Sequence, residues 1–235
     1  TSMELGGNDA FIILEDADFE LLADTITFAR LYNAGQVCTS SKRFIVVGQE
    51  NYQRFVDLVV EKFKAAKWGD PMNPETTLAP LSSATAKKQV LAQIKLAKDH
   101  GATVVYGDEA IDHPGNFVMP TVLTDITKDN PIYNQEIFGP VASIYQVDSE
   151  EAAIELANDS SYGLGSTVFS KDLTHAKEVA EKIETGMTFI NSGWASHPEL
   201  PFGGIKNSGY GRELSELGFD TFVNEHLVFV PDAAL

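Results

Sequence analysis

The sequence predicts an α/β fold in which helices cover both faces of a mostly parallel sheet. Short apolar runs alternate along the chain with segments whose apolar residues recur at helical spacing. Glycine and proline separate several of these segments. With 43% hydrophobic residues, the 235-residue chain can bury a core of ordinary size.

In the first half of the chain, apolar and β-branched runs predict strands at 11–14, 43–47 and 103–106. Apolar residues spaced three and four apart predict helices at 20–33, 50–67 and 82–100. Gly101 follows the third helix, at the position where a glycine commonly ends one. Three prolines mark residues 68–80 as a loop.

The second half continues the alternation, with predicted strands at 142–147, 166–170 and 187–191 and predicted helices at 149–159 and 172–184. Ser149 and the acidic residues after it are favourable at a helix start. The run HLVFV at 226–230 predicts a late strand with no helix after it. Such a strand often pairs with another chain or domain.

The formal charge of −17 argues against a nucleic-acid or anionic-membrane partner, because like charges repel. No run approaches the roughly 18 apolar residues of a membrane span, and the first residues do not form a signal peptide. A single cysteine cannot form an internal disulfide, so we expect a cytoplasmic protein. The five histidines show no metal-ligand spacing, so we expect no metal site.

Four short stretches combine glycines with an acid, a thiol or an aromatic residue. They are ELGG at 4–7, GQVC at 35–38, EIFGP at 136–140 and PFGGIKNSGYGREL at 201–214. In this order and at this spacing they resemble the aldehyde dehydrogenase superfamily, whose members oxidise aldehydes with NAD or NADP. The resemblance runs from Glu4 to about Val230. Within the superfamily, the chain looks most like bacterial succinate-semialdehyde dehydrogenases.

Taken alone, Cys38 would more often be a small buried residue than a nucleophile, and Glu4 would be an ordinary solvated carboxylate. Cys38 follows Glu4 by 34 positions, a separation that fits the superfamily. The resemblance implies that the Cys38 thiolate attacks the aldehyde to give a thiohemiacetal, and that loss of hydride leaves a thioester. Glu4 would then activate the water that hydrolyses it. The GQVC turn could direct backbone N–H groups at the sulfur and at the developing oxyanion.

The resemblance also implies contacts to the cofactor and the substrate. Glu136 would accept hydrogen bonds from the ribose next to the nicotinamide, Phe138 would pack near the ring, and the Leu5 carbonyl would hold the carboxamide. The aldehyde entrance would be lined by Asn191 and the 192–200 loop. Some succinate-semialdehyde dehydrogenases hold the substrate carboxylate with an arginine six residues before the cysteine. This chain has Tyr32 there, so the arginine clamp is absent at this position. Ser196 or His197 could still bind the carboxylate, and other arginines could come from the part of the superfamily's chain upstream of ELGG.

The chain begins at Thr1, and the superfamily's glycine-rich dinucleotide loop, adenosine-side lysine and oxyanion asparagine all lie upstream of ELGG. We therefore expect a catalytic domain that lacks most of its cofactor domain. Residues 1–5 would be a remnant of the cofactor domain, 6–220 the catalytic domain and 221–235 an oligomerisation strand of a homo-oligomer. The chain alone would bind NAD or NADP weakly or not at all and would be nearly inactive.

Two other functions fit the same residues. A CoA-acylating relative would use Cys38 but would not need Glu4 to activate water. A non-catalytic remnant could survive as a structural or oligomerisation module.

Overall fold

The computed structural model describes residues 1–231 and contains a central sheet of seven strands. Across the sheet the order is β4 (Thr103–Tyr106), β5 (Thr121–Thr124), β6 (Val141–Val147), β3 (Arg43–Val47), β2 (Ala10–Ile13), β8 (Gly165–Phe169) and β9 (Met187–Ile190). Every neighbouring pair is parallel except β4 and β5. The mostly parallel α/β sheet predicted from the sequence is confirmed.

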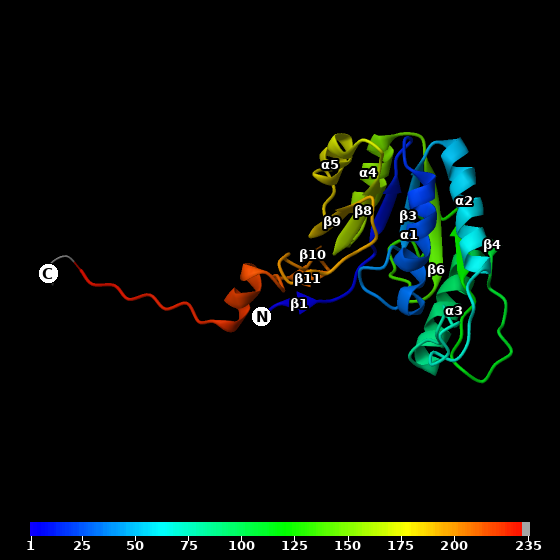
Figure 1. Ribbon diagram of the computed structural model, residues 1–235, viewed down its shortest axis with the longest axis horizontal. Helices are drawn as coiled ribbons and strands as arrows, with labels where there is room; N and C mark the ends of the chain where they lie inside the picture. Colours follow the sequence, from blue (N-terminus) through cyan, green and yellow to red (C-terminus); the bar gives the residue numbers. More distant parts are fainter. Residues whose placement is uncertain (232–235) are drawn as a thin grey trace.

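Helices cover both faces of the sheet (Figure 1). One face packs against α1 (Phe19–Leu31), α2 (Gln49–Lys64) and α3 (Ala84–Asp99), and the other against α4 (Glu150–Asn158) and α5 (Leu173–Ala180). Neighbouring strand residues serve opposite cores, so Phe11 faces the first layer and Ile12 the second. This two-sided burial explains why the strands read as continuous apolar runs.

The expected helices form, with shifted ends. Ser149 caps α4 by accepting a hydrogen bond from the Ala152 N–H at 3.2 Å, and Gly101 has the left-handed φ of +96° typical of a residue that ends a helix. The helix expected over 20–33 ends at Leu31, and the one expected over 172–184 ends at Ala180.

Five strands were not predicted from the sequence. β5 is one, because TVLT is short and lies beside a proline. The others are two-residue strands that form two antiparallel ladders outside the main sheet. One pairs β1 (Met3–Glu4) with β11 (Gly209–Tyr210), and the other pairs β7 (Tyr162–Gly163) with β10 (Ile205–Lys206). Such strands are too short for a period to be read.

Beyond β11 the chain leaves the globular part through η2, a 3₁₀ helix at Glu216–Phe222 (Figure 1). The strand expected at 226–230 is absent from the single chain, since no strand lies beside it to supply hydrogen bonds. The predicted oligomerisation segment, 221–235, lies partly outside the described residues. Among residues 1–231, no helix combines the length and apolar character needed to cross a membrane.

Candidate active site

Three of the four sequence motifs meet at one edge of the sheet because each precedes a parallel strand. ELGG comes shortly before β2, GQVC before β3 and EIFGP directly before β6. β3 lies between β2 and β6 and pairs in parallel with both. The amino ends of the three strands therefore lie side by side. Ligands of open α/β sheets usually bind at the carboxyl ends, so this candidate site lies at the opposite edge.

The turn that leads to Cys38 is left-handed. Asn33 and Ala34 have φ values of 51° and 55°, and Gly35 follows at 75°. Left-handed backbone is unfavourable for residues with a Cβ, which is why α1 ends two residues earlier than its apolar period predicts. A side chain at Gly35 would overlap the carbonyl of Gly139, so the GQVC turn packs directly on the EIFGP loop. Strained backbone of this kind is concentrated at functional sites.

Arg30, the penultimate residue of α1, connects the GQVC turn to the EIFGP loop through hydrogen bonds. Its fully buried guanidinium donates to the Gly35 carbonyl and the Ser40 hydroxyl on one side. On the other side it donates to the carbonyls of Ile137, Gly139 and Val141. All five acceptors are neutral, so burial lowers the pKa of Arg30 to about 9, while the charge of Glu136 opposes the shift.

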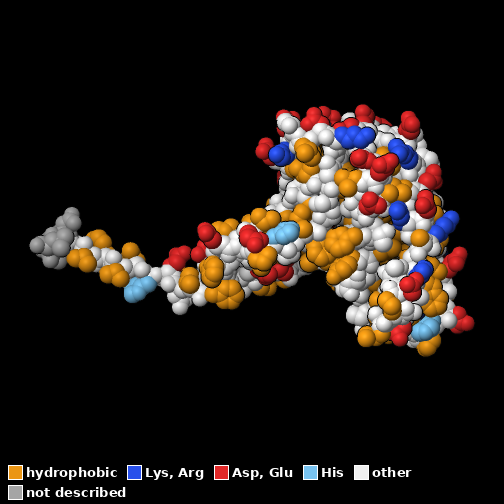
Figure 2. Space-filling view, viewed as in Figure 1, with side chains coloured by type: hydrophobic (Ala, Val, Ile, Leu, Met, Phe, Trp, Pro, Cys, Tyr) orange, Lys and Arg blue, Asp and Glu red, His pale blue; other side chains and the backbone are white. Residues whose placement is uncertain are grey.

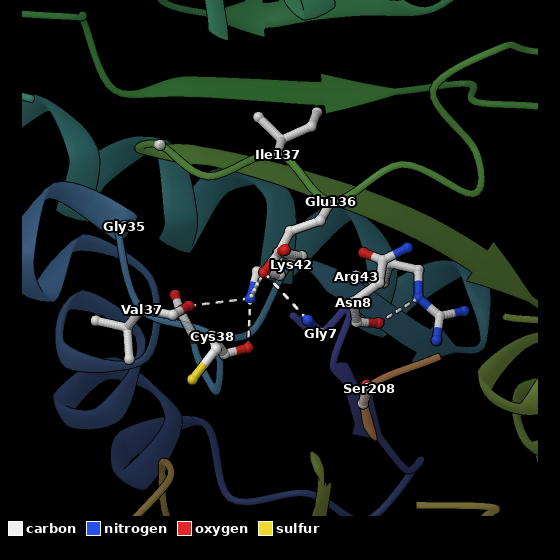
Figure 3. A network of polar contacts seen from close by, with 12 residues as sticks. Gly7, Asn8, Gly35, Val37, Cys38, Lys42, Arg43, Glu136, Ile137 and Ser208 are labelled. Carbon is white, nitrogen blue, oxygen red and sulfur yellow. Dashed lines mark hydrogen bonds and ion pairs between the residues drawn. The ribbon is translucent and has the colours of Figure 1, made fainter. Parts of the chain in front are cut away.

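Lys42 makes a second connection between the same loops (Figure 3). Its Nζ donates to the carbonyl oxygens of Val37 at 3.0 Å and Cys38 at 2.6 Å. It also forms an ion pair with Glu136 Oε1 at 3.0 Å. The Lys42 side chain is only 3% exposed, and burial lowers the pKa of its ammonium, while Asp9 and Glu136 oppose the shift.

The thiol of Cys38 is half-buried and points away from the Lys42 ammonium (Figure 3). Burial raises its pKa, and the negative charges of Asp9 and Glu4 add to the increase. The charge of Lys42 and the Thr39 N–H act in the opposite direction. Only the thiolate is nucleophilic, so the thiol must lose its proton before it can react.

Glu4 carries a carboxylate whose negative charge acts on the Cys38 thiol. The β1–β11 ladder fixes its backbone, with Glu4 opposite Gly209. Both of its carboxylate oxygens are shielded from solvent, and within residues 1–231 neither has a hydrogen-bond partner. Burial raises the pKa of Glu4, the charge of Glu213 adds to this and Arg212 opposes it. A carboxylate with a raised pKa and free lone pairs can accept a proton from a thiol or from water.

Asp9 is a third acid at this edge and lies fully inside the protein. Burial raises its pKa to about 7, against the charge of Lys42, a hydrogen bond from the Gly165 N–H and the charge of Arg43. Its Oδ1 has no hydrogen-bond partner among the described residues. The Asp9 carboxyl group thus titrates near neutral pH close to the cysteine turn.

The residues expected to contact the cofactor differ in accessibility. The Glu136 side chain is mostly buried. Its Oε1 pairs with the Lys42 ammonium and accepts a hydrogen bond from the Gly7 N–H. Phe138 is 40% exposed, with its ring centroid 5.9 Å from Lys42 Nζ, and Leu5 is 57% exposed. Contacts of Glu136, Phe138 and the Leu5 carbonyl with a nicotinamide cofactor stay a prediction.

Tyr32 belongs to an aromatic cluster that links the cysteine turn to the 192–200 loop. Its ring centroid lies 5.3 Å from that of Phe28 and 5.7 Å from that of Trp194, and Phe28 stacks on Trp194 at 5.2 Å. Tyr32 is 54% exposed, so one side of the cluster faces solvent. The loop expected at the aldehyde entrance is therefore held against the turn that carries Cys38.

The remaining predicted substrate residues differ in their surroundings. Ser196 and His197 are exposed and line a cavity of about 220 Å³ together with Phe189 and Phe202. Asn191 has both ends of its amide bonded to the backbone of Ser170, at 3.0 and 2.7 Å. The described contacts of the Asn191 side chain therefore join the end of β9 to Ser170. A contact between Asn191 and the aldehyde stays a prediction.

Arg30, Lys42 and Asp9 were not identified from the sequence. The only signal was local: a cation on the apolar face of a helix, a cation four residues after the cysteine, and an acid directly before a buried strand. None of these local patterns reveals which distant residues the side chain contacts in the folded protein. Within the described residues, no group of three or more metal-ligating side chains is present.

Comparison with known proteins places this arrangement among characterised folds. The model of the "Aldehyde dehydrogenase family" matches residues 1–228. The structure of a succinic semialdehyde dehydrogenase from Streptococcus pyogenes with NADP+ is 71% identical, with a TM-score of 0.96, over 99% of this chain and 51% of the other. That of a betaine aldehyde dehydrogenase from Staphylococcus aureus with NAD+ is 36% identical, with a TM-score of 0.90, over 94% and 44%.

Among curated sequences, a "Succinate-semialdehyde dehydrogenase [NADP(+)]" from Deinococcus radiodurans is 49% identical over 226 residues, which are 96% of this chain and 47% of that protein. The chain spans about half the length of the relatives it matches. These likenesses confirm both the fold class and the resemblance that the four motifs predicted.

Proposed function

This chain belongs to the aldehyde dehydrogenase family, and from that premise we propose that it carries the nucleophile and base of an NADP-dependent oxidation of succinate semialdehyde. The observation that carries the proposal is the pairing of a half-buried Cys38 thiol with a Glu4 carboxylate whose oxygens are both free of hydrogen bonds among the described residues. The Glu4 charge acts on the pKa of Cys38, so the two groups lie within electrostatic reach.

In the proposed reaction, the Cys38 thiol releases its proton to solvent, and the thiolate adds to the aldehyde carbon. The oxyanion of the thiohemiacetal would lie near the backbone N–H groups that follow the GQVC turn. A bound nicotinamide would accept the hydride that leaves this carbon, which becomes a thioester. Glu4 then removes a proton from water as the water attacks the thioester, releasing the acid and the thiol.

Glu136, Phe138 and Leu5 would hold the nicotinamide end of the cofactor. The exposure of Phe138 and Leu5 supports this assignment, as does Lys42, which binds both Glu136 and the Cys38 carbonyl. The choice of NADP follows the names of the relatives from D. radiodurans and S. pyogenes.

Succinate semialdehyde is proposed as the substrate because the relatives that cover nearly the whole chain are named for it. Tyr32 replaces the arginine clamp, so the far carboxylate would be held by Ser196 or His197 at the exposed loop. The aromatic cluster of Tyr32, Phe28 and Trp194 would form the apolar wall of the channel.

We also propose that residues 221–235 pair with a second copy in a homo-oligomer, and that 6–220 form the catalytic domain. Large apolar side chains follow η2 and continue along the extended segment, where Leu227 is 86% and Phe229 is 78% exposed (Figure 2). An apolar segment of this kind, with free backbone groups, is suited to strand pairing. The single cysteine fits work in the reducing cytoplasm.

The proposal is tested in the natural full-length protein by measuring NADPH formation with succinate semialdehyde, propanal and betaine aldehyde. We expect a preference for succinate semialdehyde of at least about tenfold in kcat/KM, and a loss of at least about a thousandfold in Cys38→Ala. Activity that persists in Cys38→Ala would disprove the nucleophile. Product that appears only as an acyl-CoA in the presence of CoA would show the CoA-acylating reaction instead.

A further inference from the structure

We propose that Lys42 is a positioning residue that fixes the peptide of the nucleophile to the cofactor carboxylate, Glu136. The proposal rests on the function proposed for Cys38 and Glu136. Lys42 lies four residues after the cysteine, just before β3, and does not itself contact the thiol (Figure 3).

The first argument is that Lys42 uses its whole donor capacity. An ammonium group has three N–H donors. Three acceptors lie within 3.0 Å of Nζ, namely the carbonyl oxygens of Val37 and Cys38 and Glu136 Oε1. Two of these acceptors belong to the two peptide units that flank the Cys38 Cα atom. The ammonium therefore fixes the orientation of the backbone that carries the proposed nucleophile.

The second argument is that the backbone of Lys42 is equally fixed. Its N–H donates to the Asp9 carbonyl at 3.1 Å, and its carbonyl accepts from the Ser143 N–H at 3.1 Å. Lys42 is thus held between the amino ends of β2 and β6, and its side chain is 3% exposed. A flexible surface lysine could not set a distance, but a buried lysine with five fixed bonds can.

The third argument concerns charge. A buried ammonium is costly unless acids surround it, and here Glu136 is paired with it and Asp9 acts on it from β2. The positive charge of Lys42 also favours the Cys38 thiolate, against the negative charges of Asp9 and Glu4. The Lys42 ammonium therefore interacts electrostatically with both the Cys38 thiolate and the Glu136 carboxylate that would bind the ribose.

The test measures the rate of Cys38 alkylation by iodoacetamide against pH, in the 235-residue chain, where Cys38 is the only thiol. We expect Lys42→Met to raise the midpoint of the pH profile by about one unit and to slow alkylation at pH 7.5 by roughly three- to tenfold. Lys42→Arg, which keeps the charge, should restore the midpoint to within about 0.3 units.

Lys67→Met is the matched control, because Lys67 is 65% exposed and pairs with Glu75 in the 68–80 loop region. It should leave the profile unchanged. If Lys42→Met fails to fold by circular dichroism, Lys42→Gln decides the question, since its amide can still donate to a carbonyl while the charge is lost. We expect the same upward shift in that variant.

A midpoint in the uncharged variants within about 0.2 units of the wild-type value would overturn the proposal. A second readout uses the full-length protein, where Lys42→Gln should lower kcat and also raise the KM for NADP, because both the nucleophile and Glu136 are released. A change in kcat alone would contradict the link to Glu136. Failure of the proposed function would appear differently, as activity that survives in Cys38→Ala.

Discussion

The backbone N–H of Gly7 donates a hydrogen bond of 3.2 Å to Glu136 Oε1, across 129 positions of the chain. Gly7 also lies against the cysteine turn, since a Cβ at this position would be 2.7 Å from the Cys38 carbonyl oxygen. One residue without a side chain therefore contacts both neighbouring motifs. This close approach holds the cysteine turn and Glu136 together, and only glycine permits it.

The turn before the cysteine should not tolerate a side chain. Gly35→Ala adds a Cβ that overlaps the Gly139 carbonyl and must also adopt a φ of +75°. We expect a loss of about 3 kcal/mol in the free energy of unfolding, measured by urea denaturation.

The matched control is Gly101→Ala, where φ is +96° and no atom lies within 4 Å of the added Cβ. It carries the backbone cost without the overlap, so we expect about 1 kcal/mol. Equal losses in the two variants would show that the contact with Gly139 contributes nothing.

Removing the Arg30 guanidinium should be strongly destabilising. Arg30→Met leaves the buried carbonyls of Ile137, Gly139 and Val141 without their donors, and we expect a loss of about 3–5 kcal/mol. Arg54→Met serves as the control, because Arg54 is exposed and stacks on the Phe19 ring at 4.0 Å. Its loss should be at most about 1 kcal/mol. Similar denaturation midpoints for both variants would refute the role of Arg30.

Asp9 should make the protein less stable as the pH rises. Burial raises its pKa in the folded state to about 7, above the value of an unfolded chain, so the folded state binds the proton more tightly. The stability from this group is complete below about pH 4 and is lost between about pH 4 and 7. The free energy of unfolding of Asp9→Asn, relative to the wild type, should therefore rise by about 2–4 kcal/mol over this range.

Asp16→Asn is the control with the opposite sign. Burial acts to raise the pKa of Asp16, but hydrogen bonds from Ser170, Asp172 and Lys171 outweigh it and lower the pKa. Its contribution is present above about pH 4 and is lost at lower pH. Asp16→Asn should thus be less stable than the wild type at pH 7, with a deficit that shrinks on acidification. Parallel pH curves for both variants would contradict the raised pKa of Asp9.

Replacing the proposed base should separate the two halves of the reaction. In the natural full-length protein, Glu4→Gln should form up to one equivalent of NADPH per site and then turn over about 10²–10⁴ times more slowly, because water is no longer activated. Rapid-mixing absorbance at 340 nm measures the burst. Glu75→Gln, an exposed acid paired with Lys67, should behave as wild type. Full steady-state turnover in Glu4→Gln would exclude Glu4 as the hydrolytic base.

Part of the architecture could be read from local patterns. The alternation of apolar runs and helical periods predicts the parallel sheet, and Ser149 and Gly101 mark helix ends that the structure confirms. The end of α1 could not be read, because its apolar period continues through Tyr32 while the packing of Gly35 on Gly139 turns the chain earlier. The strand expected at 226–230 needs a neighbour that the single chain lacks.

The sequence by itself determined the order of the motifs, the identity of the one thiol and the acid that precedes it, because these depend on residue type and spacing. Only the tertiary structure decided how these groups are held and charged. Arg30 bonds to Val141 across 111 positions, and Lys42 pairs with Glu136 at 3.0 Å. Such partners meet because parallel strands bring distant segments to one edge, and burial there shifts their proton equilibria. Neither effect can be seen in a local window of residues.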